Sequence, residues 1–156
     1  MIGRYILVAC DIAGTSCKIA IDTNVLVYAV DSSEPVKQTK AIQLLEALSQ
    51  SPQPLVVPWQ VAVEFLACLR RWEIAGRVTR DDTRIYKSQF LDVQPLAMPT
   101  AAILGASLDL SERHSLSYWD SLLIAACIEA GITTLYTEDL DSGAKYGTVS
   151  TINPFK

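Results

Sequence analysis

The sequence has few of the groups on which common hydrolases depend. His114 is the only histidine among 156 residues, which excludes catalysis by a pair of histidines and the usual multi-histidine zinc sites. It falls in a polar turn between two predicted helices, so we expect an ordinary loop residue rather than a catalytic base. The patterns G-x-x-x-x-G-K-[ST], G-x-S-x-G and G-x-G-x-x-G are absent, so neither a phosphate-binding loop nor a serine nucleophile is indicated.

Positive charge and long hydrophobic runs are also scarce. Thirteen Lys and Arg against 17 Asp and Glu give a net charge of −4, so an RNA or DNA substrate would need a local basic face. No run approaches about 18 apolar residues, which excludes a membrane span. Asp11 interrupts the first apolar stretch before it reaches the length of a secretory signal. We therefore expect a cytoplasmic protein with no membrane association.

The cysteines form no recognisable framework. They include no C-x-x-C pair, and two of them, Cys68 and Cys127, lie in apolar segments with helical periodicity. We expect all four, including Cys10 and Cys17, to be reduced thiols.

The composition favours one globular domain, because 50% of the residues are hydrophobic and 19% are charged. Short apolar runs alternate with longer segments of helical periodicity, and this alternation predicts an α/β fold with a largely parallel sheet. Strands are expected at 18–21, 54–57 and 132–136, with weaker candidates at 93–96 and 148–152. Helices are expected at 39–50, 59–73, 79–91, 100–113 and 118–130.

Four acidic residues fall where a parallel α/β sheet collects its ligands, at the carboxyl ends of strands or on the helices that follow them. They are Asp22, Glu64, Asp120 and Asp139. Asp22 also opens the run Asp22-Thr23-Asn24, which places a carboxylate, a hydroxyl and an amide at one strand end. Glu64 is conspicuous because its helix is apolar almost all round.

Each of these acids also has a purely structural explanation. Asp22 fits a helix cap or a turn residue, and Glu64 fits a position near the positive end of its helix. Ser117 and Asp120 fit the S-x-x-D capping box of a helix start. The acids that flank Asp139, which are Glu138 and Asp141, are expected to be simply solvated.

Convergence of the four carboxylates would require a cation. Two carboxylates about 4 Å apart repel by roughly 4 kcal/mol at an effective dielectric constant near 20. Oxygen ligands without histidine or cysteine favour Mg²⁺ or Mn²⁺ over zinc. Such an ion polarises a phosphodiester and lowers the pKa of a bound water, which would permit hydrolysis without a histidine base.

Five elements follow one another in a distinctive order and spacing. They are IDTNVL at 21–26, Glu64 on its helix, YWDSLLIAA at 118–126, YTEDL at 136–140 and NPF at 153–155. Together they resemble the PIN-domain ribonucleases, and among these the VapC-like toxins of type II toxin–antitoxin pairs. The resemblance covers about residues 19–156. It implies a three-layer α/β/α sandwich over 18–156, preceded by an N-terminal extension at 1–17.

The resemblance also implies a function. It is that of an endoribonuclease dependent on Mg²⁺ or Mn²⁺, in which metal-activated water cleaves RNA. It implies a homodimer and an antitoxin partner that lies in a groove near the helices 39–50 and 59–73. The implied metal ligands are Asp22, Glu64, Asp120 and Asp139, and the implied supporting residues are Asn24 and Thr137.

A basic stripe offers a surface for RNA independently of the resemblance. Its members are spaced so that they share one side of a helix, and they are Arg77, Arg80, Arg84 and Lys87. Phosphate contact is one interpretation, and an ordinary solvated face with acids interleaved is the other.

Two further functions remain open. The segment Asp11–Lys18 is similar to the D-x-G-G-T-x-x-K phosphate loop of actin-like sugar kinases, with Ala13 in place of the first glycine, although 156 residues are too few for the two domains of such a kinase. The extension is alternatively expected to be an added edge strand, Tyr5–Ala9, or a segment translated from an upstream start codon with no role. The chain could also be a PIN-like module that binds a partner without catalysis.

Overall fold

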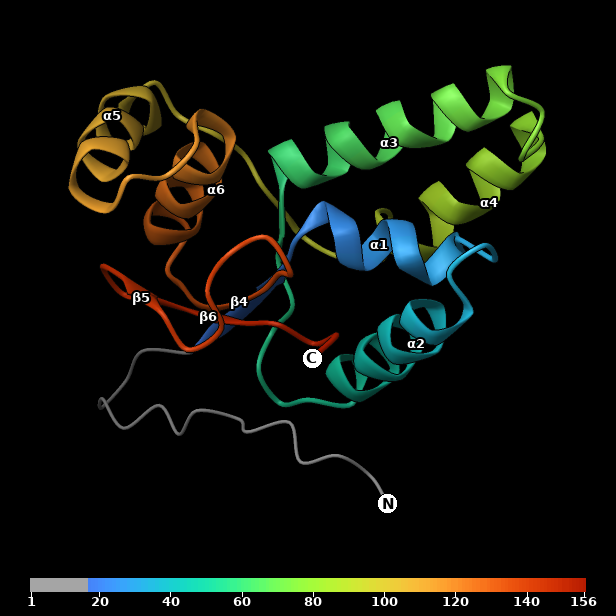
Figure 1. Ribbon diagram of the computed structural model, residues 1–156, viewed down its shortest axis with the longest axis horizontal. Helices are drawn as coiled ribbons and strands as arrows, with labels where there is room; N and C mark the ends of the chain where they lie inside the picture. Colours follow the sequence, from blue (N-terminus) through green and yellow to red (C-terminus); the bar gives the residue numbers. More distant parts are fainter. Residues whose placement is uncertain (1–16) are drawn as a thin grey trace.

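A four-stranded, mostly parallel sheet lies at the centre of the protein, of which the computed structural model describes residues 17–156 (Figure 1). Its strands run in the order β1-β4-β6-β5, in which β1, β4 and β6 are parallel and β5 is antiparallel to β6. The strands are β1 (Lys18–Ile21), β4 (Ile132–Tyr136), β5 (Lys145–Tyr146) and β6 (Val149–Ile152). The predicted strands 18–21 and 132–136 are confirmed, and the predicted strand 148–152 differs by one residue.

A second sheet, of two parallel strands, lies beside β1. It consists of β2 (Val57–Pro58) and β3 (Leu96–Ala97). The chain before β2 is bonded to β1, since the Ile19 N–H donates to the Pro54 carbonyl at 3.0 Å and the Val56 N–H donates to the Ile19 carbonyl at 2.8 Å. Most of the predicted strand 54–57 is therefore reduced to a single parallel bridge between Ile19 and Leu55. The pairing does not continue as a ladder, because Pro54 and Pro58 have no N–H to donate.

Six helices surround the strands within residues 17–156. They are α1 (Thr23–Val30), α2 (Pro35–Ser49), α3 (Trp59–Ile74), α4 (Arg80–Phe90), α5 (Ala102–His114) and α6 (Tyr118–Glu129). The five predicted helices are confirmed with shifted ends. The sequence did not predict α1, because eight residues that are apolar on nearly every side carry no clear helical period.

The helices form the outer layers of a three-layer α/β/α arrangement. Figure 1 shows α5 and α6 together on one side of the molecule and α1 to α4 gathered on the other. The helix α6 contacts β4 and β6, while α1 packs on α2 and α3. Buried side chains of both sides join one core with β1 and β4, which confirms the predicted α/β fold. Within residues 17–156, no helix has the length and apolar character needed to cross a membrane.

The cysteines differ from the prediction at one position. Cys68 and Cys127 are free, and Cys127 is completely buried. Cys17, by contrast, is disulfide-bonded, so the expectation of four reduced thiols is wrong. A disulfide depends on the distance between two Cα atoms in the fold, which sequence spacing does not reveal. Cys10, the possible edge strand 5–9 and most of the loop 11–18 lie outside the described residues.

Candidate active site at the carboxyl ends of the strands

Asp22 stands where the neighbouring strands β1 and β4 end. It follows β1, and its backbone N–H donates to the carbonyl of Tyr136, the last residue of β4, at 2.9 Å. Because β1 and β4 are parallel neighbours with Ile21 opposite Tyr136, the residues that follow them meet at one edge of the sheet. The side chain of Asp22 is only 7% exposed.

Three hydrogen bonds hold the Asp22 carboxylate. Its Oδ1 accepts from the Thr23 N–H at 2.6 Å, which makes Asp22 the N-cap of α1. Its Oδ2 accepts from Thr137 Oγ1 at 2.7 Å and from Asn24 Nδ2 at 3.2 Å. Burial raises the pKa of Asp22 to about 6, hydrogen bonds from Thr137 and Thr23 oppose this rise, and the charges of Asp139 and Glu64 add to it. Asp22 is thus both a helix cap and a buried acid among other acids.

Asn24 joins Asp22 to the loop that follows β4. Its Nδ2 also donates to Asp139 Oδ2 at 3.1 Å and lies 3.5 Å from Thr137 Oγ1. The same hydroxyl of Thr137 accepts from the Asp139 N–H at 3.1 Å. One amide therefore lies between two carboxylates that come from opposite ends of the chain. The other amide atom, Oδ1 of Asn24, is buried and has no hydrogen-bond partner.

Glu64 reaches this group from α3. Its Oε2 accepts from Thr23 Oγ1 at 2.9 Å, and its Oε1 accepts from Gln60 Nε2 at 3.0 Å. Since the charge of Glu64 raises the pKa of Asp22, the two carboxylates share one electrostatic environment. The hydroxyl of Thr23 and the amide of Asn24 thus tie three of the four predicted acids to one strand end.

Asp120 lies in the first turn of α6 and is bonded to the N-cap residue of that helix. Its N–H donates to Ser117 Oγ at 3.2 Å, and Ser117 Oγ donates to Asp120 Oδ2 at 2.6 Å. The N-cap at Ser117 is therefore confirmed, but Asp120 accepts from the Ser117 hydroxyl instead of from the Ser117 N–H, so the predicted capping box is only half formed. Among the described residues, no hydrogen bond links Asp120 directly to the other three acids. Gln60 makes the indirect connection, because its Nε2 donates to both Glu64 and the carbonyl of Trp119 at 3.2 Å.

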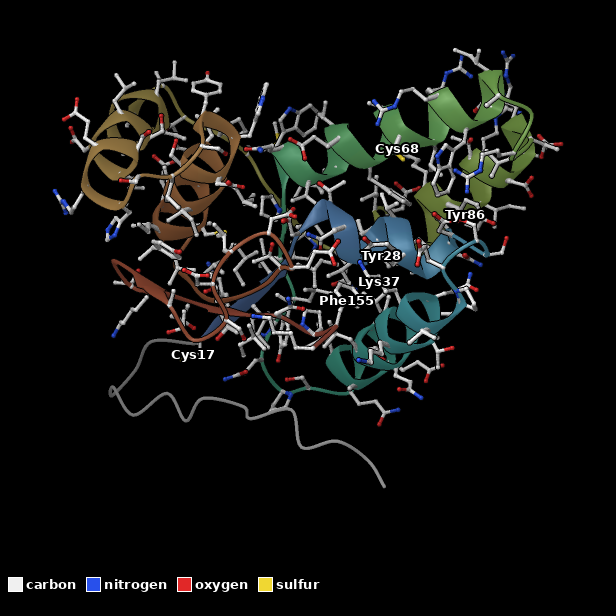
Figure 2. The ribbon with its side chains drawn as sticks, viewed as in Figure 1. Cys17, Tyr28, Lys37, Cys68, Tyr86 and Phe155 are labelled. Atoms are coloured by element: carbon white, nitrogen blue, oxygen red, sulfur yellow. The ribbon has the colours of Figure 1, made fainter. Side chains whose placement is uncertain are left out.

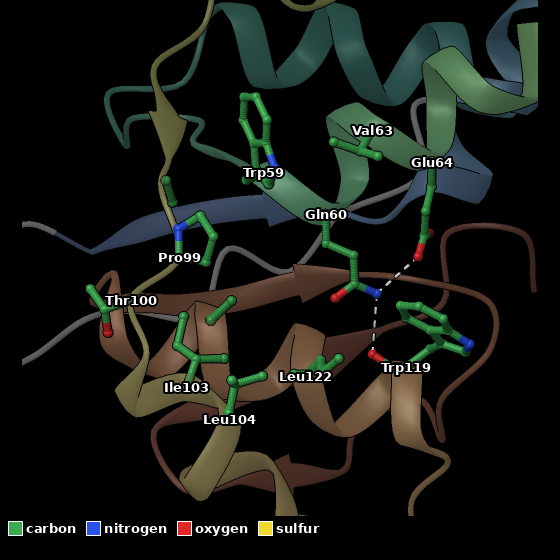
Figure 3. Close-up of a pocket in the computed structure, with 12 residues that line it drawn as sticks. Trp59, Gln60, Val63, Glu64, Pro99, Thr100, Ile103, Leu104, Trp119 and Leu122 are labelled. Atoms are coloured by element: carbon green, nitrogen blue, oxygen red, sulfur yellow. Dashed lines mark hydrogen bonds between the residues drawn. The ribbon is translucent and has the colours of Figure 1, made fainter.

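An apolar groove of about 510 Å³ opens beside Glu64, and Figure 3 shows Gln60 crossing it with hydrogen bonds to Glu64 and Trp119. The indole of Trp119 is 61% exposed and that of Trp59 is 42% exposed. The groove lies between α3 on one side and α5 and α6 on the other. Its apolar lining includes Trp59, Val63, Ile103, Leu104, Trp119 and Leu122.

The donor atoms of the site suit a hard divalent cation. They are carboxylate oxygens from Asp22, Asp139 and Glu64, together with the unpartnered Oδ1 of Asn24. Across residues 17–156, no three side chains of His, Cys, Asp or Glu stand close enough to form a complete metal cage. Mg²⁺ does not need such a cage, since it commonly takes one or two carboxylates and keeps several waters. The residues present therefore fit Mg²⁺ or Mn²⁺.

The predicted basic stripe does not lie on one helix, because Arg77 precedes α4 (Arg80–Phe90), and its charges are largely neutralised by nearby acids. Its ion pairs are Arg77 with Asp31 at 2.8 Å, Arg84 with Asp81 at 3.4 Å and Lys87 with Asp92 at 2.6 Å. Arg77 also stacks on the ring of Trp72, with 4.1 Å between the guanidinium carbon and the ring centroid. Arg80 has no carboxylate partner in the part of the chain that the structure describes. The stripe thus has the character of a solvated face more than of a free cationic surface.

Glu138 is the residue whose environment the sequence misjudged. It was expected to be solvated, but its side chain is only 21% exposed. Glu138 accepts hydrogen bonds from the hydroxyl of Tyr28 and from Lys37 Nζ. Neither partner could be inferred from the sequence, because Lys37 lies 101 residues away. Gln60 was missed for the same reason.

The protein has an α/β fold, and acidic side chains gather where its parallel strands β1 and β4 end. The family model of the PIN domain matches residues 19–146, and the chain therefore belongs to the PIN-domain family. This confirms the resemblance noted in the sequence. No curated protein matches the sequence.

Solved structures share this fold at low sequence identity. A toxin–antitoxin complex from Klebsiella pneumoniae is similar over 88% of this chain and 98% of that one, with 16% identity and a TM-score of 0.63. VapBC2 from Rickettsia felis, bound to a DNA fragment from its promoter, matches 85% of this chain and 96% of that one, with 15% identity and a TM-score of 0.60. VapC20 of Mycobacterium tuberculosis, a sarcin-ricin loop cleaving toxin, matches 76% of this chain and 87% of that one, with 18% identity and a TM-score of 0.57.

Proposed function

We propose that this PIN-domain protein is an endoribonuclease dependent on Mg²⁺ or Mn²⁺ and the toxin of a toxin–antitoxin pair. The observation that carries the proposal is the pair of hydrogen bonds from Asn24 Nδ2 to Asp22 at 3.2 Å and to Asp139 at 3.1 Å. The buried carboxylate of Asp22 and the exposed carboxylate of Asp139 are held together there, and their mutual repulsion favours the arrival of a cation. We assign the domain to residues 18–156 and treat 1–17 as an extension.

We assign the metal to Asp22, Glu64, Asp120 and Asp139. When bound, a divalent cation would polarise the phosphodiester and lower the pKa of a water. Thr137 and Asn24 orient the Asp22 carboxylate through Oδ2. Gln60 and Thr23 orient Glu64 in the same way. These four polar residues hold the acidic oxygens in place before any substrate arrives.

Asp22 also sets the condition for activity. With a pKa of about 6, the Asp22 carboxyl is ionised in most molecules at neutral pH. A cation needs the ionised form, because a protonated carboxyl is a poor ligand. Activity is therefore expected to increase as the pH rises through about 6.

The choice of RNA as substrate draws on the relatives. VapC20, whose fold is similar, is a sarcin-ricin loop cleaving toxin, and RNA loops are recognised largely by shape and by unstacked bases. Contact with phosphates through Arg77, Arg80, Arg84 and Lys87 is a subordinate part of the proposal, since three of these side chains already have acidic partners. We place the protein in the cytoplasm, where such an RNA would be reached.

An antitoxin is the proposed protein partner. Two of the similar structures are described as a toxin–antitoxin complex and as VapBC2. A hollow of about 330 Å³ lies beside α2, and its wall includes Ile42, Leu45, Phe90 and Val93. Ile42 is 40% exposed and Val93 is 63% exposed, so an apolar segment could be buried there. The opposite wall comes from α4 and not from the helix 59–73.

A homodimer is the proposed assembly. Several large apolar side chains that line the groove beside Glu64 are exposed, namely Val63, Leu104 and Trp119, and Leu108 of α5 is exposed as well. Leu104 and Leu108 lie four residues apart and so share one face of α5. Exposed apolar side chains gathered at one groove are typical of an interface between proteins.

RNA cleavage tests the proposal directly. The full chain should cleave a structured RNA in the presence of Mn²⁺, lose this activity with EDTA, and lose it again in Asp22→Asn. Metal-independent cleavage, or equal cleavage by Asp22→Asn, would refute the nuclease assignment. A protein that binds Mn²⁺ and cleaves no RNA would instead favour a PIN-like binding module.

The kinase alternative has its own test. The loop Asp11–Lys18 would carry an ATP-dependent phosphoryl transfer that Asp11→Asn abolishes. The match of the PIN domain to residues 19–146 supports the nuclease over this alternative. Phosphorylation of a sugar by the wild type and not by Asp11→Asn would reverse that preference.

A further inference from the structure

We propose that Lys37 and Tyr28 are positioning residues, which hold Glu138 and thereby fix the loop that carries Asp139. This inference rests on the proposed function, because it assigns a task to residues next to the proposed metal site. Neither Lys37 nor Tyr28 is one of the proposed ligands. Tyr28 lies on α1 and Lys37 lies on α2.

The three side chains form a closed triangle. Lys37 Nζ donates to Glu138 Oε2 at 2.8 Å and to the hydroxyl of Tyr28 at 2.8 Å. The hydroxyl of Tyr28 donates in turn to Glu138 Oε1. Lys37 Nζ also lies 4.3 Å from the centroid of the Tyr28 ring, which adds a cation–π attraction. Both oxygens of Glu138 are therefore occupied, and its side chain has a single anchored position.

This triangle is protected by the end of the chain. The ring of Phe155 meets the ring of Tyr28 edge to face, with 5.0 Å between centroids, and Lys37 Nζ is 5.8 Å from the Phe155 centroid. Figure 2 shows Tyr28, Lys37 and Phe155 next to one another. Lys40 Nζ donates to the Phe155 carbonyl at 2.8 Å and holds this segment in place. The side chain of Lys37 is still 35% exposed and that of Glu138 is 21% exposed, so water screens part of the charge attraction and the hydrogen bonds fix the geometry.

The anchored residue lies between two residues of the site. Thr137 donates to Asp22, and Asp139 accepts from Asn24, while the side chain of Glu138 goes to the triangle. Asp139 is itself exposed, and its carboxylate has a hydrogen bond only from Asn24 among the described residues. The position of its carboxylate therefore depends on the backbone of the loop. Thr137 attaches this backbone to the start of α1 through Asp22 and Asn24, and Glu138 adds the attachment to Tyr28 of α1 and Lys37 of α2.

The test compares variants whose charge effects have opposite signs. Glu138→Ala removes a negative charge near the site, whereas Lys37→Met removes a positive one. Simple electrostatics predicts weaker Mn²⁺ binding in the first and tighter binding in the second. Positioning predicts weaker binding in both, by about 10-fold or more, as for other residues that orient metal ligands. Tyr28→Phe, which changes no charge, should weaken binding by a smaller factor.

Isothermal titration calorimetry of the full chain with Mn²⁺ provides the main readout, and Asp141→Ala is the matched control. Asp141 is an exposed acid in the same loop, so its removal should leave Mn²⁺ affinity within about twofold of the wild type. Amide hydrogen exchange without metal provides the second readout. The N–H of Asp139, which donates to Thr137, should exchange faster in Glu138→Ala than in Asp141→Ala. If a variant has lowered thermal stability, the exchange rate of the Asp139 N–H is measured at a temperature where all variants are folded.

Two outcomes separate this inference from the proposed function. If Glu138→Ala and Lys37→Met bind Mn²⁺ as tightly as Asp141→Ala does, and Asp22→Asn does not bind it, positioning by the triangle is overturned and the metal site stands. Tighter binding in Lys37→Met also overturns positioning. If the wild type and Asp22→Asn bind Mn²⁺ equally, the proposed metal site itself is refuted.

Discussion

The carboxylates of Asp22 and Asp139 accept hydrogen bonds from one and the same nitrogen, Nδ2 of Asn24. The first follows β1, and the second lies in the loop after β4. Pairing of these two parallel strands brings the acids to one edge of the sheet, and the amide determines the distance between them. Asn24 thus connects the acid that follows β1 with the acid that follows β4.

Replacing Asn24 with alanine removes both hydrogen bonds and no charge. The two carboxylates then lose their shared donor, so Mn²⁺ affinity and RNA cleavage are both expected to fall by about 10-fold. Calorimetry and initial cleavage rates measure the two effects. Gln94→Ala, which removes an amide that hydrogen-bonds to none of the described site residues, serves as a control. An Asn24→Ala variant with wild-type affinity and rate would show that the amide is not needed.

The raised pKa of Asp22 predicts a pH-dependent stability. Because its folded pKa is about 6 instead of the ordinary 3.8, the folded protein holds this proton more tightly than the unfolded chain does. The free energy of unfolding should therefore decrease as the pH rises from about 4 to about 6, by at most about 3 kcal/mol at 1.36 kcal/mol per pKa unit.

Asp22→Asn removes this penalty. In EDTA at pH 7 the variant should melt at a higher temperature than the wild type, and the difference should shrink toward pH 4. Thermal unfolding followed by circular dichroism at several pH values measures the effect. A variant that is less stable than the wild type at pH 7 would contradict the burial of an ionised Asp22.

Ser117 and Asp120 allow the cap and the proposed ligand to be separated. Ser117→Ala removes the cap of α6 and should lower stability by about 1 kcal/mol, with cleavage nearly unchanged at a temperature where the protein is folded. Asp120→Asn keeps a group that can accept from Ser117 and should lose cleavage by 10-fold or more with little change in stability. If Asp120→Asn cleaves RNA as the wild type does, Asp120 is a cap alone.

The exposed apolar face predicts the effect of a charge on assembly. Leu104 is 57% exposed beside the groove, and Leu104→Asp should convert a dimer into a monomer while the fold is kept. Size-exclusion chromatography with light scattering measures the mass. Ile74→Asp, at the opposite end of α3 and 84% exposed, should remain dimeric. A wild type that is monomeric at high concentration would exclude the dimer.

Much of the fold could be predicted because its signals are local. The strands 18–21 and 132–136 are short apolar runs, and Gly131, which has a positive φ of 71°, ends the preceding helix just before the second of them. The cap at Ser117 was visible from its spacing to Asp120. By contrast, α1 is too short and too uniformly apolar for its period to be read.

The gathering of three acids at one strand end could be predicted from the sequence and their connections could not, while their role as metal ligands stays a proposal. Asp22, Glu64 and Asp139 stand out by their places on the strands and on α3, but their hydrogen-bond partners depend on contacts between distant segments. Lys37 meets Glu138 across 101 residues, and Gln60 meets the carbonyl of Trp119 across 59. No local pattern encodes such pairs, so the anchored Glu138 was mistaken for a solvated acid.

Calorimetric titration of Mn²⁺ into the wild type and into Asp22→Asn examines the cation site most directly. Both proteins are measured folded, at pH 7 and without RNA, so that binding is separated from cleavage. The wild type should bind the ion, and Asp22→Asn should bind it at least 10-fold more weakly. Equal titration curves for the two proteins, or no binding by either, would show that these carboxylates do not gather around a metal.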